Sequence, residues 1–153
     1  MVKRVAQAKY WRGLRLAGPL LLAAACTPQG TIERPDLLPK MTAPRFCSLD
    51  TAGGIKRLVV TITNQGAPIP GGRPPIATRV VFPARQKFQG ASVTLDIPSG
   101  FVWSRDSDYQ HVIEIPANAF EPDLVFTITA DYGDVIDEGP NEWNNTITGA
   151  CSG

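Results

Sequence analysis

The stretch Leu124-Val-Phe-Thr-Ile-Thr-Ala130 decides the fold, because every second residue in it is apolar. Alternate residues from Leu124 onward are predicted to point into a core, whereas Thr127 and Thr129 are predicted to point outward. A period of two residues is typical of a β-strand with one buried face. The same alternation recurs on both sides of this stretch, in residues 55–63, 76–82, 93–97, 111–115 and 145–151.

Turn-forming residues separate these stretches and indicate how many strands the chain contains. Asn64-Gln65-Gly66 ends one strand and Pro98-Ser99-Gly100 ends another, because Asn, Pro and Gly favour tight turns. Several prolines make residues 31–46 an extended edge segment or a linker, since proline donates no hydrogen bond to a ladder. About seven short strands, with no helical period after the N-terminal segment, predict an antiparallel β-sandwich.

Composition and charge agree with one packed domain and exclude some classes of function. The chain has 153 residues, of which 43% are hydrophobic and 19% charged, with 14 Gly, 14 Pro and a single His. That length suits one domain plus a targeting segment, and one His excludes a site that needs two His ligands. Residues 106–153 contain ten acidic residues and no Lys or Arg. A nucleic-acid partner is not expected, because the chain after the targeting segment has no basic stripe interleaved with aromatic residues.

The N-terminal segment is predicted to be a processing signal. Five basic residues and no acidic residue lie in residues 1–25, and the apolar stretch Leu16–Ala25 is too short to span a bilayer as a helix. Leu22-Ala-Ala-Ala-Cys26 resembles the lipobox of bacterial lipoproteins. The resemblance implies cleavage before Cys26, a diacylglycerol on its thiol, a flexible tether over residues 26–34 and a place in the cell envelope. The other interpretation is an ordinary secretory signal followed by an incidental cysteine.

The remaining cysteines, Cys47 and Cys151, are predicted to form a disulfide. Export places them in an oxidising compartment, and they lie near the two ends of the folded region. In the chain-entropy model such a bridge stabilises the fold by about 4–5 kcal/mol. The alternative is a reactive thiol at one of the two positions.

If the host is Gram-negative, Thr27 after Cys26 implies the outer membrane, by resemblance to lipoprotein sorting rules.

Three motifs carry a second family resemblance. Pro35-Asp36-Leu37 opens the domain, Thr63-Asn64-Gln65-Gly66 ends an early strand, and Glu138-Gly-Pro-Asn-Glu-Trp-Asn-Asn145 precedes the last strand. In this order they resemble the CARDB (cell-adhesion-related) domains of bacteria. The resemblance implies an immunoglobulin-like sandwich over residues 35–153 and a role in adhesion.

The acidic segment before the last strand is a candidate calcium site or a set of turn caps. Carboxylates bind calcium when at least three converge, whereas Asp and Asn side chains also cap turns by accepting backbone N–H bonds. The spacing is not that of an EF-hand loop. The five candidate carboxylates are Asp131, Asp134, Asp137, Glu138 and Glu142.

Binding is expected rather than catalysis. His111 lies near serines and aspartates but shares the phase of Ile113 and Ile115, and the chain after residue 25 contains no Gly-x-Ser-x-Gly elbow. Trp143 lies in the polar segment and is the candidate ligand contact; its alternative role is a lid over the end of the sandwich. The sequence therefore predicts a membrane-tethered module, without a cofactor, that binds a protein or glycan. Its alternatives are an accessory carbohydrate- or calcium-binding module and a purely structural envelope lipoprotein.

Overall fold

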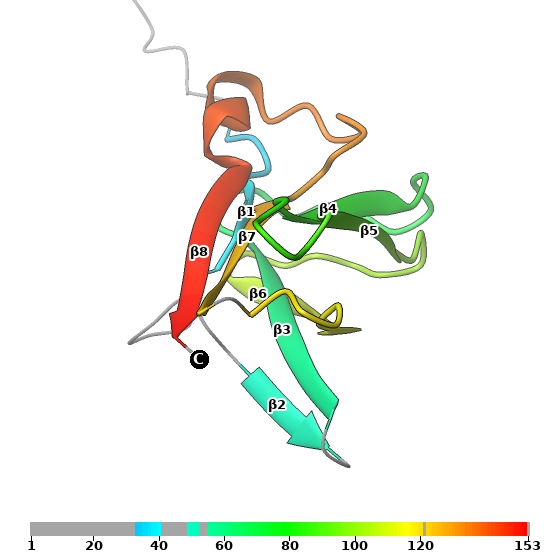
Figure 1. Cartoon of the computed structure of the whole chain (residues 1–153). Coiled ribbons are helices and arrows are strands. Elements are labelled where there is room, and N and C mark those ends of the chain that lie inside the picture. Colours follow the sequence, from blue (N-terminus) through cyan, green and yellow to red (C-terminus); the bar gives the residue numbers. More distant parts are fainter. Residues whose placement is uncertain (1–32, 41–48, 53–54, 121, 153) are drawn as a thin grey trace, which may run out of the picture. The chain divides into compact units, whose positions relative to one another are not determined.

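The computed structural model describes residues 33–40, 49–52, 55–120 and 122–152 (Figure 1). In these ranges the chain forms strands joined by turns and one short 3₁₀-helix, η1. The elements in chain order are β1 (Leu37–Pro39), β2 (Leu49–Ala52), β3 (Ile55–Asn64), β4 (Ile76–Phe82), β5 (Ala91–Ile97), β6 (Ser107–Glu114), β7 (Asp123–Thr129), η1 (Gly139–Asn144) and β8 (Thr146–Ser152).

The strands form two antiparallel sheets. In the first, β3 is central, β6 lies along one of its edges, and β1 and β2 share the other edge. The second sheet has the order β5-β4-β7-β8. This order corresponds to strands C′, C, F and G of an immunoglobulin-like sandwich, and β1, β3 and β6 correspond to A, B and E. The predicted all-β sandwich is therefore confirmed.

One hydrophobic core lies between the sheets and joins them. Its largest fully buried side chains are Trp103, Phe82 and Phe126. Leu58, Val60 and Ile62 of β3 cover the same core from the first sheet, and Ile76, Val80, Leu124 and Ile128 cover it from the second. The alternation predicted for residues 76–82 is confirmed, because β4 has those bounds and buries every second residue.

Two local features go beyond what the alternation predicts. Thr61 and Thr63 lie on the face of β3 opposite the core residues, yet they are only 3% and 4% exposed, because β3 has neighbouring strands along both edges. The acidic segment before the last strand, in which only turn caps or a calcium site were expected, contains a 3₁₀-helix with a proline in its first turn. Strand β2 had no signal in the sequence.

The strand register brings four segments to one end of the sandwich. Leu37 at the start of β1 pairs with Asn64 at the end of β3, and Asn64 pairs with Ser107 at the start of β6. In Figure 1 the coil of η1 lies beside the segment that enters β1, and β8 ends at the other end of the sandwich. We call this region the loop end; it comprises residues 33–36, 65–75, 98–106 and 130–145.

Candidate binding surface at the loop end

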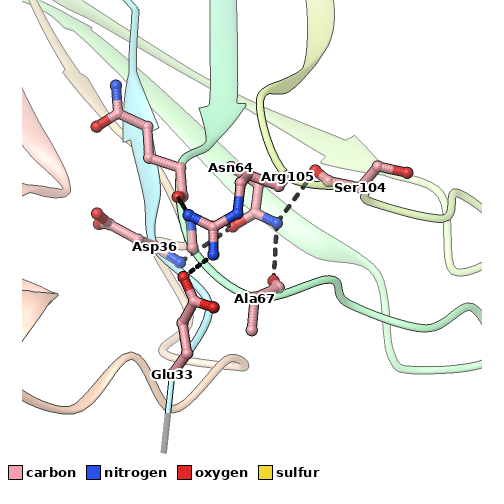
Figure 2. Close-up of polar contacts among 8 residues, drawn as sticks. Glu33, Asp36, Asn64, Ala67, Ser104 and Arg105 are labelled. Atoms are coloured by element: carbon pink, nitrogen blue, oxygen red, sulfur yellow. Dashed lines mark hydrogen bonds and ion pairs between the residues drawn. The ribbon is translucent and has the colours of Figure 1, made fainter. Parts of the chain in front are cut away.

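Asn64 holds the loop end together at its centre (Figure 2). Its side-chain oxygen accepts hydrogen bonds from the backbone N–H groups of Asp36 at 3.1 Å and Gly66 at 3.2 Å. Its side-chain nitrogen donates to the carbonyl oxygens of Ala67 at 2.9 Å and Ser104 at 3.3 Å. The side chain is fully buried and thereby joins three separate loops through four hydrogen bonds.

The segment that enters β1 is clamped against these loops by two ion pairs. Arg105 pairs with Glu33, as Figure 2 shows, and Arg34 pairs with Asp137. The carbonyl of Arg34 also accepts a bond from Ala67 N–H at 2.8 Å. All four charged groups are substantially exposed, so each pair contributes about 0–1 kcal/mol to stability. These ion pairs place residues 33–36 beside the acidic segment before β8, residues 131–145, which we call the acidic loop.

Asp131 organises the first half of the acidic loop. Its two carboxylate oxygens accept the backbone N–H groups of Val135 at 3.0 Å and Ile136 at 2.7 Å. Its backbone is in the left-handed region, with φ of 41°, a conformation that Asp adopts more readily than most residues. Burial raises the pKa of Asp131, and the two backbone N–H bonds act in the opposite direction. Asp131 is therefore the cap of this turn.

Glu142 and Asn144 brace the second half of the loop. One oxygen of Glu142 accepts the N–H of Glu138 at 2.9 Å, and the other accepts the side-chain amide of Asn145 at 3.1 Å. Asn144 donates from its side chain to Asp36 at 2.9 Å, across 108 positions of sequence. These bonds hold η1 firmly against the entry to β1.

Glu138 is the unusual residue of this region. Its side chain is fully buried, and neither carboxylate oxygen has a hydrogen bond of normal geometry within the described part of the chain. Burial raises the pKa of Glu138 to about 8; the Leu37 N–H acts against that rise, and the carboxylates of Glu142, Asp131 and Asp36 reinforce it. Near neutral pH the folded chain therefore holds Glu138 mainly in its uncharged form.

Large apolar side chains at the loop end are exposed to solvent. Trp143 on η1 is 81% exposed, Val102 is 62% exposed and Tyr132 is 50% exposed. The Tyr132 ring has the Arg79 guanidinium 4.7 Å from its centre, whereas the Trp143 indole projects from a helix that other side chains brace. An exposed indole on a rigid support is a typical contact residue.

The candidate carboxylates do not gather into one site. Asp131 and Glu142 cap backbone groups, Asp137 pairs with Arg34 and accepts Gly139 N–H at 3.0 Å, and Glu138 is buried. Asp134 is exposed, with φ of 51°. Within the described ranges, no group of three or more His, Cys, Asp or Glu side chains is placed to hold a metal ion. Three of the five carboxylates, those of Asp131, Asp137 and Glu142, therefore cap backbone N–H groups.

The predicted modification sites lie largely outside the described residues. Cys26 and Cys47 fall there, while Cys151 is buried at the end of β8. None of the helices in the described ranges has the length and apolar character of a membrane span.

His111 lies on the edge strand β6 with its side chain half-buried. It packs edge to face on Tyr109, with 5.0 Å between ring centres. Burial lowers the pKa of His111, while the charge of Asp96 raises it. This environment is that of a packing residue.

Sequence reasoning missed two features of the loop end. The burial of Glu138 had no signal, because its neighbours in sequence are polar or turn-forming. The role of Asn64 had a partial signal, since Asn-x-Gly after a strand indicates a turn. Comparison with protein-family models, curated proteins and solved structures found no match to this chain.

Proposed function

We propose that this chain is a membrane-tethered, extracytoplasmic binding module whose loop end contacts its partner. The observation that carries the proposal is the 81% exposed indole of Trp143 on a helix held by Glu142 and Asn144. Ordering of a contact side chain costs affinity on binding, and a braced support reduces that cost. An adhesion role, binding an envelope protein or another envelope component, follows from this surface and from the resemblance to CARDB domains.

The tether is the second part of the proposal. Lipidation of Cys26 is supported by the lipobox-like sequence, and a Cys47–Cys151 disulfide by export and by the burial of Cys151. Mass spectrometry of the purified chain tests both modifications. We expect an acyl adduct on the peptide that begins with Cys26 and a crosslinked pair of peptides containing Cys47 and Cys151. An unprocessed chain with free thiols would overturn this part.

The binding surface is tested by a photo-crosslinking residue placed at position 143 in cells. We expect one dominant adduct, with a protein or a lipid of the envelope fraction. Excess unlabelled wild-type chain should suppress this adduct, whereas the Trp143→Ala chain should not. The matched control places the crosslinker at Val112, which is also exposed, at 52%, but lies on β6. Equal adducts from the two positions would contradict a binding role for the loop end.

A carbohydrate partner is the alternative, and two exposed aromatic side chains support it. Trp143 and Tyr132 are exposed aromatic side chains of one loop, and aromatic rings present an apolar face together with a polar edge. A glycan array separates the two: saturable sugar binding that Trp143→Ala abolishes would favour the carbohydrate module.

A further inference from the structure

We propose that the loop end is the face of the domain that rests on the lipid bilayer, with the Trp143 indole among the lipid headgroups. This inference rests on the proposed lipidation of Cys26. It goes beyond a general binding role because it names the occupant of the surface.

The exposed apolar side chains gather at the loop end. Among the described residues, four large apolar side chains are exposed: Val102, Val112, Tyr132 and Trp143. All but Val112 belong to loops of the loop end. Trp and Tyr favour the headgroup region of a bilayer, because their rings are apolar at one end and polar at the other.

The first described residues of the chain also lie at the loop end. Glu33 pairs with Arg105, and Arg34 pairs with Asp137 in the loop that carries η1. Glu33, the first described residue, therefore lies at the loop end, beside the support of Trp143. Glu33 lies seven positions after Cys26, and seven extended residues reach about 25 Å at most. An acyl chain on Cys26 would hold this end, rather than the C-terminal end, close to the membrane.

The charge of the loop end bears on which lipids it accepts. The loop end carries eight carboxylic acids and three arginines. Arg34 and Arg105 are engaged in ion pairs, and Arg73 donates to the carbonyl of Phe101 at 2.9 Å. The excess negative charge disfavours an anionic surface over about one Debye length. We therefore infer a preference for zwitterionic headgroups.

Tryptophan emission tests this contact directly. The processed chain would keep two tryptophans, Trp103 and Trp143, and Trp103 is fully buried. The acylated chain is reconstituted into phosphatidylcholine vesicles whose acyl chains carry bromine, which quenches nearby indoles. We expect about twofold quenching of the emission component that Trp143→Ala removes. The control Val112→Ala, which changes an exposed apolar residue of β6, should leave the quenching unchanged.

Vesicle flotation separates this proposal from the proposed function. The chain could float with the vesicles while bromine fails to quench the Trp143 emission and aqueous acrylamide quenches it as strongly as in detergent. That result would overturn the bilayer contact and leave the tether intact. A chain that fails to float and carries no acyl group overturns both. Anionic phosphatidylglycerol vesicles at low salt should reduce the bromine quenching, and high salt should restore it. Stronger quenching in the anionic vesicles would overturn the inferred lipid preference.

Discussion

The buried carboxyl of Glu138 makes stability depend on pH in a direction that can be worked out. Its pKa rises from 4.5 to about 8 on folding, because burial disfavours the charged form. Between these values the folded chain keeps a proton that the unfolded chain has released, so the free energy of unfolding falls as pH rises. The stabilisation that comes from the proton on Glu138 is fully present below about pH 4.5 and is lost by about pH 8.

Replacement of Glu138 by Gln removes this titration and keeps the side-chain shape. At one pKa unit per about 1.4 kcal/mol, the wild type should lose about 3 kcal/mol relative to Glu138→Gln between about pH 4.5 and pH 7. The total loss should approach about 5 kcal/mol above pH 8. An amide left without acceptors would shift the whole difference curve by about 1–3 kcal/mol but would not change its slope.

Urea unfolding of both chains across this pH range measures the difference. Subtraction of the two curves of unfolding free energy against pH cancels the contributions of the other titrating groups. Among these, the raised pKa of Asp131 acts in the same direction as that of Glu138, and the lowered pKa of His111 acts in the opposite direction. Glu114→Gln, at an exposed position on β6, controls for the loss of one acidic group. A difference between wild type and Glu138→Gln that stays constant from acid to alkaline pH would refute the reasoning.

Four further outcomes follow from the loop end and the cysteines. Asn64→Ala should destabilise the fold by about 3–5 kcal/mol in urea unfolding, because it leaves buried N–H and C=O groups without partners, whereas an effect below about 1 kcal/mol would contradict the role of this hub. Gly66→Ala should cost about 2 kcal/mol or more, since its added methyl group would lie 2.1 Å from the Arg34 carbonyl oxygen, and Gly100→Ala, where nothing lies within 4 Å, should cost less. Cys151→Ser should lower the unfolding free energy by about 4–5 kcal/mol if Cys47 is its partner, and equal stability with and without reductant in the wild type would argue against the pairing. Millimolar calcium, compared with chelator, should leave the melting temperature unchanged, because the acidic loop uses its carboxylates as turn caps; a clear rise would restore the calcium hypothesis.

Alternation along the chain was enough to predict most strands, because each one depends on a local pattern. Residues 76–82 and 124–130 show the pattern most clearly, and β4 and β7 lie there. The weaker signals failed for physical reasons. β2 is short and forms only by pairing with Lys56 and its neighbours in β3, and Thr61 is buried because neighbouring strands flank β3.

The candidate site was predicted only in part. Trp143 was identified from its position in a polar segment, and its exposure agrees with a contact role. The five carboxylates were treated as equivalent in the sequence, whereas the structure gives them four different environments. The ion pair of Asp137 depends on a distant segment that comes near, whereas the caps formed by Asp131 and Glu142 join residues only a few positions apart.

The sequence by itself determined the strand pattern, the acidic character of the last third of the chain and the signal-like N-terminus, because these properties belong to neighbouring residues. Only the tertiary structure decided that Arg34 meets Asp137, that Glu138 is buried, and that the exposed indole of Trp143 lies at the same end of the sandwich as Glu33, the first described residue. Such contacts join residues about 100 positions apart. They arise from strand pairing and register, and no local pattern of side chains contains that information.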